Sequence, residues 1–535
     1  MSALVTGHSR KFALVRRFTC ERLVRVPAVG CVIAIDAGTS GVRALAVDEA
    51  GEVVDVSYRE IRQYFPRPGW VEHDPAEIWA AVAGTVDEVA RRQAAAGRAV
   101  AGIGITNQRE TVVGWDRSTG AVQHRAIVWQ DRRTAGRCDE LRAAGHLPVV
   151  RESTGLVLDP YFSATKMAWL LTEGAVAVTG DLVLGTVDSW LIWNLTGGVD
   201  AGVVATDASN ASRTLLYDIR SREWSDEMGQ IFGVPLGVLP TVQPSCGRFG
   251  QVGGELGSGG SPLAGVPVSG VAGDQQAALF GQACFGAGMA KVTYGTGSFV
   301  LMNVGEACPP PAEGLLTTMA WDLGDHGGSS PVAYALEGAV FVTGAAVQWL
   351  RDGLGLIKDS AEIGALAGRV ESSEGVYVVP AFTGLGSPWW DPYARGMITG
   401  LTRGVGAGHI GRAVVESMAY QVRDVVDAMS EVGGGVSALR VDGGASVMDL
   451  LLQMQADQIQ GPVQRPATAE TTALGAAMLA GLAEGVWDST EQLSSLWKLE
   501  RSFGPEKSRV AADAGHAGWR RAVERSLGWA PADQG

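Results

Sequence analysis

The chain has 535 residues, and its 43 Lys and Arg residues against 57 Asp and Glu residues give a net charge of −14. This acidic balance argues against a general nucleic-acid or anionic-membrane binder, which needs net positive charge, although a small anionic substrate stays compatible with it. Hydrophobic residues make up 46% of the chain, and Gly and Pro together about 18%, which excludes disorder over most of its length. The length allows three or four domains, or two large ones.

The six cysteines are scattered and form no C-x-x-C pair, so we expect neither a disulfide framework nor a zinc site. Buried or idle thiols in a reducing compartment are the ordinary interpretation. No uncharged apolar run reaches the ~18 residues that a membrane span needs, and we therefore expect no integral membrane segment.

Residues 1–30 form a basic leader, in which six Arg and Lys residues face Glu21 as the single acid. An organellar transit peptide has such a composition. The long apolar centre and the small-residue cleavage site of a secretory signal are both missing from it. We expect a disordered extension that contributes nothing to the fold, and a cytoplasmic location, with an organellar location as the alternative.

A strand–loop–strand pattern follows the leader. Apolar runs of strand length begin at Cys31 and flank the turn Gly38-Thr39-Ser40-Gly41. The same pattern recurs at Met289–Val304 around Gly295-Thr296-Gly297-Ser298. This approximate internal repeat predicts one hairpin near the start of each half of the chain.

Amphipathic helices are predicted downstream of each hairpin. The first starts after Asp74, which can cap it, with Pro75 at the first helical position and Glu77 completing a capping box. Apolar residues recur at helical spacing through this segment, and again from Ile410 to Met429 in the second half. Alternating strands and helices predict α/β layers.

A Gly-rich stretch near Gln282–Gly288 precedes the second hairpin and suits a hinge. We therefore expect two domains, at residues 31–282 and 283–530.

The two Gly-Thr loops can turn backbone N–H groups and hydroxyls toward one point, and such a nest binds anions, phosphate above all. Arg43, close behind the first loop, can add a fork of charged donors. A third glycine pair, Gly443-Gly444, lets the backbone approach a flat ring closely. Loops of this kind in both halves predict a phosphate-bearing ligand between them.

Two other nucleotide motifs are excluded. The chain contains no G-x-x-x-x-G-K-[ST] and hence no P-loop. A G-x-G-x-x-G does occur at Gly406–Gly411, with Glu431 about twenty residues on, which resembles a dinucleotide fingerprint. The preceding Leu401–Val405 is a poor buried strand, so we expect only a loop that leads into a helix.

Two aspartates end apolar strands beside Gly turns, Asp36 directly before the first loop and Asp274 at the end of the run that starts at Val268. A carboxylate placed there can hold Mg²⁺ or take a proton, or else simply cap the turn. Phosphoryl transfer needs positioning, charge neutralisation by a metal ion and a base for the attacking hydroxyl. Both aspartates are therefore candidates for that chemistry.

Arg109 and Glu110 stand side by side after another apolar strand and supply donors and an acceptor suited to vicinal hydroxyls. Trp129, Tyr161 and Phe299 can enclose a carbon skeleton, with the Tyr161 hydroxyl as one more partner. Core packing is the alternative for these three aromatic residues.

From Cys31 to about Trp529 the chain resembles the glycerol kinases of the carbohydrate-kinase family, which has the actin/Hsp70-type ATPase fold. Two longer patterns of the family are met at Tyr161–Glu173 and Gly396–Glu416, and the second explains the G-x-G-x-x-G. The context of Arg109 and Glu110 separates these enzymes from the pentulose kinases of the family. The motifs that carry the resemblance are Pro68–Pro75, Gly104–Thr111, Ala126–Gln130, Asp159–Ser163, Gly270–Gly281, Tyr294–Phe299 and Tyr377–Gly386.

The resemblance implies two actin-like (ribonuclease H-like) α/β ATPase domains that flank a nucleotide cleft, and ATP-dependent phosphorylation of glycerol to sn-glycerol 3-phosphate. It implies that Asp274 is the catalytic base and that Asp36 and Asp274 hold Mg²⁺ through water or phosphate. A homodimer or homotetramer is expected on the same ground. The residues implied to bind glycerol are Arg109, Glu110, Trp129, Tyr161, Asp274, Gln275 and Phe299. The residues implied to bind ATP are Thr39, Ser40, Gly41, Arg43, Thr296, Gly344, Gln348, Gly444 and Met448.

The chain departs from the family pattern at three places. The first loop reads D-A-G-T-S-G from Asp36 where the family usually has D-Q-G-T-T-S, which keeps the backbone amides and loses one hydroxyl. Met448 replaces the usual Asn, which puts that nucleotide contact in doubt, although a thioether can pack on a base. Residues 258–266 lack the Arg that binds fructose 1,6-bisphosphate in regulated relatives, so we expect no response to that sugar.

Three rival functions stay open at this point. A kinase for another polyol or a ketose is the nearest. A chaperone-like or actin-like binding protein with the same ATPase fold would not need Arg109 and Glu110, and its ATP turnover would not depend on glycerol. A catalytically inactive homologue is disfavoured, because Asp36 and Asp274 are both present.

Overall fold

The computed structural model describes residues 30–326, 328 and 331–530. The expectation for the basic leader therefore lies, apart from Gly30, outside the described residues. Within the described ranges, no helix is long and apolar enough to cross a membrane.

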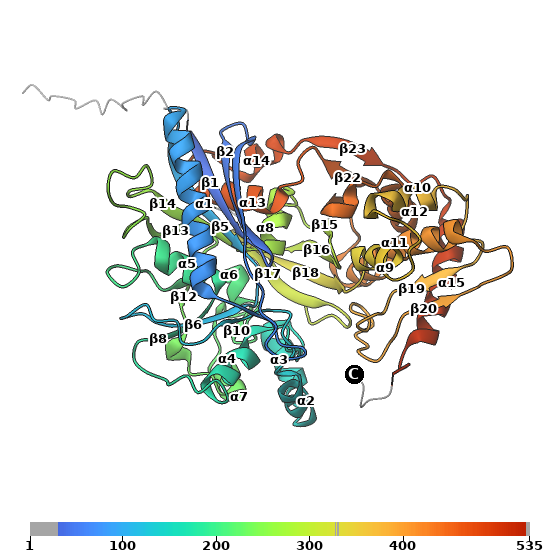
Figure 1. Ribbon diagram of the computed structural model, residues 1–535, viewed down its shortest axis with the longest axis horizontal. Helices are drawn as coiled ribbons and strands as arrows, with labels where there is room; N and C mark the ends of the chain where they lie inside the picture. Colours follow the sequence, from blue (N-terminus) through green and yellow to red (C-terminus); the bar gives the residue numbers. More distant parts are fainter. Residues whose placement is uncertain (1–29, 327, 329–330, 531–535) are drawn as a thin grey trace, which may run out of the picture.

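Two β-sheets form the frame of the molecule (Figure 1). The first contains six strands in the order β13 (Cys246–Gln251), β14 (Pro267–Gly273), β5 (Ala99–Asn107), β1 (Gly30–Ala37), β2 (Gly41–Asp48) and β3 (Val53–Glu60). The second contains seven, in the order β17 (Leu316–Asp322), β18 (Val332–Val340), β16 (Ser298–Gly305), β15 (Met289–Tyr294), β21 (Ala438–Asp442), β22 (Val463–Pro466) and β23 (Leu499–Phe503).

The smaller sheets pair β4 (Glu72–His73), β7 (Ala126–Ile127), β6 (Val112–Asp116) and β8 (Leu182–Thr186); β10 (Tyr217–Asp218) and β11 (Glu223–Trp224); β12 (Thr241–Gln243) and β9 (Ala205–Asp207); and β19 (Tyr377–Val379) and β20 (Met397–Thr399). The α-helices are α1 (Pro75–Ala95), α2 (Ala135–Ala143), α3 (Leu147–Thr154), α4 (Ser163–Leu171), α5 (Val187–Leu195), α6 (Ala208–Ala211), α7 (Asp226–Phe232), α8 (Asp274–Gly281), α9 (Gly344–Asp352), α10 (Ile363–Ala367), α11 (Ala407–Gly433), α12 (Asp449–Ile459), α13 (Thr471–Ala483), α14 (Thr490–Leu496) and α15 (Arg509–Ser526).

Both predicted hairpins are confirmed. Strands β1 and β2 pair antiparallel, as do β15 and β16, and in each case the first strand also pairs in parallel with a later one, β5 or β21. The two sheets thus repeat the same unit, because each hairpin has a short Gly-Thr turn and each parallel partner returns by a long crossover.

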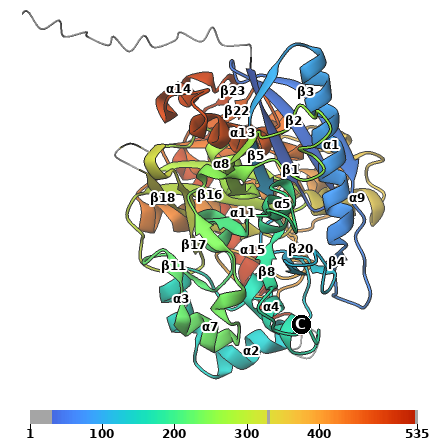
Figure 2. The same ribbon diagram turned by 90° about the vertical axis from the view of Figure 1, so that its left-hand side faces the viewer.

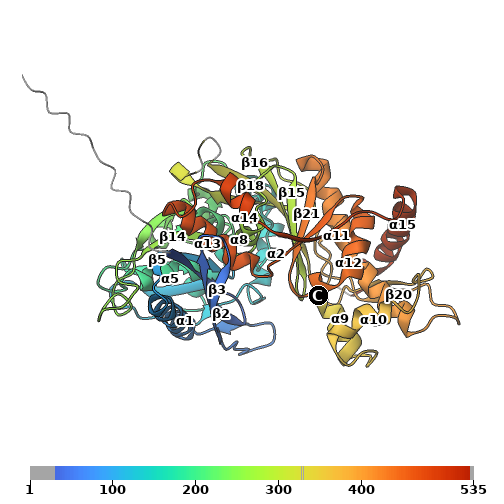
Figure 3. The same cartoon turned by 90° about the horizontal axis from the view of Figure 1, so that it is seen from above.

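The elements are stacked in layers. Helices α1 and α5 cover one face of the first sheet, and α8 and α13 cover its other face (Figure 2). Helix α8 also packs on the second sheet, whose opposite face is covered by α11 (Figure 3). Helices α8 and α13 therefore form a middle layer between the two sheets.

The two middle helices touch backbone to backbone. A Cβ atom added to Gly475 would lie 1.9 Å from the Ala277 carbonyl oxygen, and one added to Gly281 would lie 2.0 Å from the Thr471 carbonyl oxygen. Only glycine permits so close an approach. Although α13 follows the second hairpin in the chain, this contact fixes it against α8 and the first sheet.

The first predicted helix forms with the predicted cap and with Pro75 in its first turn, but without the predicted capping box. Asp74 caps α1 by accepting a hydrogen bond from the Ala76 backbone N–H. The predicted capping box is wrong, because the Glu77 carboxylate accepts the Tyr64 hydroxyl at 2.8 Å instead. A contact from outside the helix thus engages the Glu77 side chain that the local pattern assigned to the helix end.

The second predicted helix is α11, and its apolar face, including Val414, Met418 and Val425, is buried. Residues 401–405 form no strand, and Gly406 caps the helix. The expectation that the G-x-G-x-x-G is only a loop into a helix is therefore confirmed.

Candidate active site

Strand alternation turns Asp36 and Arg43 toward the middle layer. Asp36 lies on the same face of β1 as Val32 and Ala34, which pack in the core shared with α8 and α13. Arg43 is the cross-strand partner of Asp36 on β2. A half-buried acid and a charged donor of the first sheet thus stand together at the strand ends beside the first Gly-Thr loop.

The second sheet presents three functional side chains to the same layer. Leu301 and Ala335 belong to the shared core, and strand alternation with the β15–β16–β18 register puts Lys291, Phe299 and Glu337 on that face too. The middle layer therefore receives polar groups from both sheets.

The Arg109–Glu110 pair sits in a tight turn at the end of β5. Glu110 has φ of 61°, a left-handed conformation that is unusual for a residue with a side chain and costs of order 1 kcal/mol. Both side chains are buried, with 2% and 1% of their surface exposed. The Ser163 hydroxyl donates a hydrogen bond to the Glu110 carbonyl oxygen at 3.1 Å and helps to hold this strained turn.

A ring of four buried charges surrounds this turn. Glu337 Oε2 accepts a hydrogen bond from Arg109 Nη1 at 2.6 Å, and Glu337 Oε1 accepts one from Arg213 Nη2 at 2.9 Å. Arg213 Nε in turn donates to Glu110 Oε1 at 2.7 Å. Opposite charges alternate around the ring, so each arginine lies between two carboxylates.

The ring determines how its acids ionise. Burial alone would raise the pKa of the Glu337 carboxyl, but Arg109 and Arg213 outweigh it and lower the pKa to about 2. Burial also raises the pKa of Glu110, and there the same two arginines only partly compensate. Glu337 is therefore the firmly ionised member of the pair.

Asp274 begins α8 and lies at the open side of the ring. Its Oδ1 is 3.0 Å from Arg109 Nε, and 32% of its side chain is exposed, in contrast to Arg109 and Glu110. The backbone N–H of Gln275 donates to the same oxygen at 2.7 Å. This carboxylate is thus oriented by a guanidinium and still reachable by a ligand.

Two of the three predicted aromatic walls meet beside this cluster. The rings of Trp129 and Tyr161 are 5.6 Å apart in a T-shaped contact, and Arg109 Nη2 donates to the Tyr161 hydroxyl at 3.3 Å. Trp129 Nε1 donates to the Thr39 hydroxyl at 2.9 Å. One tryptophan therefore touches both the predicted alcohol site and the first predicted phosphate loop.

A buried lysine supports the Tyr161 loop from behind. Lys166 Nζ donates to the carbonyl oxygens of Pro160, Tyr161 and Phe162 at 2.9, 2.7 and 2.6 Å. Burial lowers the pKa of this amine to about 8. The ammonium binds three successive carbonyl oxygens and so helps to fix the backbone under Tyr161.

The first phosphate loop is a closed turn, with the Gly38 N–H bonded to the Gly41 carbonyl oxygen at 3.0 Å. Arg43, which was predicted to bind phosphate, pairs with Glu470 at 2.9 Å, so a phosphate would have to compete with that carboxylate. Burial raises the pKa of Asp36 to about 7; Arg43 opposes this, and the charges of Asp274 and Glu470 add to it. The Asp274 charge is therefore near enough to act on Asp36.

The second loop is joined to α9. The Thr296 carbonyl oxygen accepts from the backbone N–H groups of Thr343 and Ala345, and the Gly344 N–H bonds to the Gly295 carbonyl oxygen, each at 3.0 Å. Gly344 and Gln348 therefore lie on the helix that starts at this loop.

The third loop packs against the second. Gly443 has φ of 84°, and an added Cβ would lie 2.5 Å from the Tyr294 carbonyl oxygen. Gly444 starts the short 3₁₀ helix Gly444–Val447, and Met448 caps α12. Because Thr471 donates to Asp442 at 2.7 Å beside Glu470, a continuous path of contacts connects all three loops.

Four polar residues of this region were missed by the sequence reasoning. Glu337 and Lys291 are single charged residues within the apolar runs Val332–Val340 and Met289–Tyr294, and that pattern was the available signal. The Gln276 amide oxygen accepts from Arg109 Nη1 at 3.2 Å, but it and Arg213 carried no local signal. Lys291 Nζ donates to the Gln275 side chain, and burial lowers its pKa to about 8.

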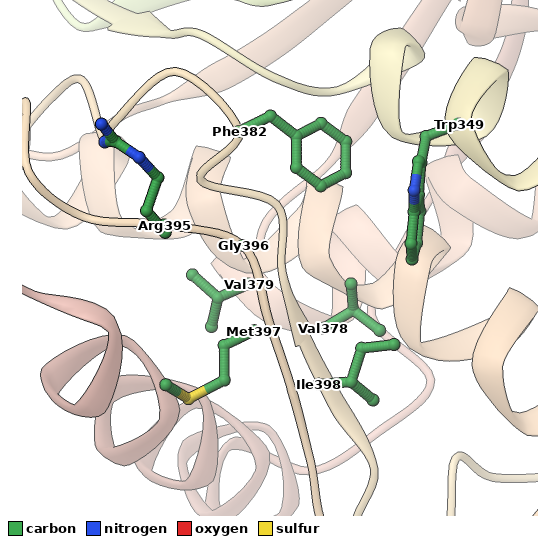
Figure 4. A pocket seen from close by; sticks show the side chains of 8 residues that line it. All are labelled: Trp349, Val378, Val379, Phe382, Arg395, Gly396, Met397 and Ile398. Atoms are coloured by element: carbon green, nitrogen blue, oxygen red, sulfur yellow. The ribbon is translucent and has the colours of Figure 1, made fainter. Parts of the chain in front are cut away.

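A separate cavity of about 460 Å³ lies between α9 and the β19–β20 pair (Figure 4). Trp349, Phe382 and Met397 contribute to its lining, and no predicted site residue does. It therefore belongs to neither predicted ligand site.

Comparison with known proteins gives a consistent result. The model of the FGGY family of carbohydrate kinases, N-terminal domain, matches residues 31–281, and that of the C-terminal domain matches residues 290–484. The glycerol kinase of Bordetella parapertussis is 51% identical over 503 residues, which cover 93% of this chain and 97% of the relative. Glycerol kinase 2 of Thermotoga maritima is 50% identical over 503 residues, covering 93% and 99%.

Among solved structures, Plasmodium falciparum glycerol kinase with ADP matches with a TM-score of 0.86 and 35% identity, covering 93% of this chain and 98% of that one. Xylulose kinase from Rhodospirillum rubrum, at 24% identity and a TM-score of 0.81, shares the fold.

Proposed function

Since the chain belongs to the FGGY family of carbohydrate kinases and has its two-domain, actin-like α/β fold, we propose that it transfers the γ-phosphoryl group of ATP to glycerol. The product is sn-glycerol 3-phosphate. Relatives at 50 to 52% identity over nearly the whole chain carry the name glycerol kinase, which supports this acceptor over a pentulose.

The observation that carries the proposal is the environment of Asp274. Its carboxylate is oriented by Arg109 at 3.0 Å and by the α8 backbone, yet a third of it is exposed, next to two fully buried polar side chains. An alcohol at this place meets a proton acceptor on one side and fixed charged partners on the other.

In the proposed reaction, the Asp274 carboxylate accepts the proton of a terminal glycerol hydroxyl. That oxygen forms a bond to the γ-phosphorus, and the bond from the γ-phosphorus to the bridging oxygen breaks, so that ADP leaves. Arg109, Glu110 and Tyr161 hold the remaining hydroxyls. Gln275, Trp129 and Phe299 complete the alcohol site.

The phosphates of ATP are assigned to the two Gly-Thr loops, with Thr39, Ser40, Gly41 and Arg43 on one side and Thr296 on the other. Arg43 is expected to exchange Glu470 for a phosphate oxygen, since both are charge-assisted acceptors. Gly344, Gln348, Gly444 and Met448 are assigned to the nucleoside end, where they stand on the elements that border these loops.

Asp36 and Asp274 fit a magnesium ion, because each offers carboxylate oxygens and the charge of one raises the pKa of the other. Among the described residues no group of three or more His, Cys, Asp or Glu is arranged to hold a metal ion, so water and phosphate would supply the other ligands. When bound, Mg²⁺ would neutralise charge on the transferring phosphoryl group.

A coupled ADP-release assay with glycerol, dihydroxyacetone, erythritol and xylulose tests the proposal. We expect glycerol to give the highest kcat/KM. A site built for a hydroxyl can reject the analogue that lacks it by ~10⁴–10⁵, so 1,2-propanediol should be a very poor substrate. Equal kcat/KM for the two alcohols, or ADP release that does not depend on any alcohol, would overturn the assignment.

Two further expectations stay part of this proposal. The division into residues 31–282 and 283–530 is supported by the sheets, since the first is built before Asp274 and the second after Gly288. Assembly into a homodimer or homotetramer is tested by light scattering on the purified protein.

A further inference from the structure

The alcohol site contains a residue of the second sheet that no sequence pattern assigned to it. Glu337 lies on β18, is fully buried, and accepts hydrogen bonds from two arginines that belong to segments packed with the first sheet. Arg109 follows β5, and Arg213 follows α6. The carboxylate therefore connects the two halves of the molecule at the point where the alcohol is expected.

Glu337 also accepts half of the hydrogen bonds that the terminal nitrogens of Arg109 donate within the protein. The two terminal nitrogens of Arg109 donate four hydrogen bonds within the protein, to Glu337 Oε2 at 2.6 Å, Glu337 Oε1 at 3.2 Å, Gln276 at 3.2 Å and Tyr161 at 3.3 Å. Only the Glu337 bonds join two charges, and charge-assisted bonds are the strong ones. An incoming hydroxyl would replace a long neutral contact and leave the fork to Glu337 in place.

We propose that Glu337 is a positioning residue of the alcohol site, which locks the Arg109 guanidinium so that its Nε edge faces Asp274 and its Tyr161 edge faces the alcohol. The inference rests on the proposed function. Through Arg213, the same carboxylate also holds Glu110, the second predicted hydroxyl partner, in the ring. Both hydroxyl-binding side chains thus depend on one residue from the other sheet.

The test compares Glu337→Gln, Glu337→Asp and Asp424→Asn with the wild type. Glutamine keeps the size of the side chain but loses its charge and one of its two acceptor oxygens, so the two-oxygen fork to Arg109 is lost. Aspartate keeps the charge but is one methylene shorter. Asp424 is the matched control, a buried carboxylate of α11 that accepts from His516 at 2.6 Å and Trp519 at 2.7 Å and contacts no predicted site residue.

We expect Glu337→Gln to lower kcat/KM for glycerol about 10- to 100-fold, mainly through KM, because a hydrogen bond between charged groups is lost. KM for ATP should stay within about twofold, Glu337→Asp should lie in between, and Asp424→Asn should leave both KM values unchanged. If Glu337→Gln does not fold, Glu337→Asp and Arg213→Lys carry the same comparison. A buried ion pair that serves stability alone would reduce the amount of active enzyme and leave KM for glycerol unchanged.

A double-mutant cycle with Arg109→Ala gives the sharpest readout. Because Glu337 holds Arg109 directly and Glu110 through Arg213, the loss of kcat/KM for glycerol in the double variant should be clearly smaller than the two single losses multiplied together. Additive losses, an unchanged KM for glycerol, or equal increases in both KM values would overturn the inference. Wild-type turnover across the alcohols tests the proposed function separately, so a different preferred alcohol would change the substrate used in the cycle but not its logic.

Discussion

Replacing Asp36 by Asn should change the free energy of unfolding, and the sign of this change follows from the structure. The ordinary pKa of an aspartate is 3.8, and burial raises that of Asp36 to about 7, against the pull of Arg43 and with the added charge of Asp274. Folded Asp36 therefore binds its proton more tightly than unfolded Asp36. Its contribution to the free energy of unfolding is complete below about pH 4 and is lost as the pH rises to about 7.

The size of the effect follows from the same values. A pKa that moves from 3.8 to about 7 corresponds to about 4 kcal/mol. Because the side chain is only partly buried, solvent screens part of this, and we expect about 2 kcal/mol. Asn cannot ionise, so Asp36→Asn should be more stable than the wild type by about 2 kcal/mol at pH 8, or about 4 °C for a unit of ~250 residues.

The assay is thermal unfolding of the ligand-free protein at pH 5, 6, 7 and 8. The gap between variant and wild type should grow from pH 5 to pH 7 and then level off. When both proteins also carry Asp274→Asn, the gap should level off at a lower pH. That substitution removes a charge that raises the pKa of Asp36. A variant less stable than the wild type at pH 8, or a gap that does not change with pH, would refute the reasoning.

Three further outcomes are expected. Asp274→Asn should lower kcat by ~10²–10⁴ while folding normally, since the side chain is a third exposed; circular dichroism and steady-state kinetics check this. Trp129→Phe and Thr39→Val should each lower kcat/KM for ATP, and their double variant should show coupling of about 1 kcal/mol, the value of one hydrogen bond; additivity would contradict the contact. Fructose 1,6-bisphosphate should leave the activity unchanged, because residues 258–266 contain no basic side chain; strong inhibition in the ADP-release assay would disprove it.

The parts of the fold that depend on neighbouring residues could be predicted from the sequence. The hairpins at β1–β2 and β15–β16 and the long amphipathic helix α11 follow from alternation, turn residues and helical spacing, which act over a few residues. The predicted capping box at Glu77 is wrong because a residue outside this short window competes for the side chain. The Tyr64 hydroxyl, 13 positions away in the chain, donates a hydrogen bond to the Glu77 carboxylate.

The candidate site could be predicted from the sequence where its reactive side chains lie at the ends of strands. Arg109 and Glu110 stand just beyond the end of β5, Asp274 directly follows β14, and motif resemblance assigned them roles. Phe299 was a candidate for enclosing the carbon skeleton, with core packing as the alternative, and its place on the α8 face of β16 comes from the strand register. These roles remain proposals that the kinetic experiments test.

By itself, the sequence determined the family, the two Gly-Thr hairpins and the residues beside them, because these are written in short motifs. Only the tertiary structure decided that Glu337 meets Arg109 across 228 positions of sequence, and Arg213 across 124. It also decided that Arg43 pairs with Glu470 and that Trp129 touches Thr39. Such contacts depend on how two sheets stack around a shared middle layer, and hydrophobic burial fixes that stacking without leaving a local pattern in the chain.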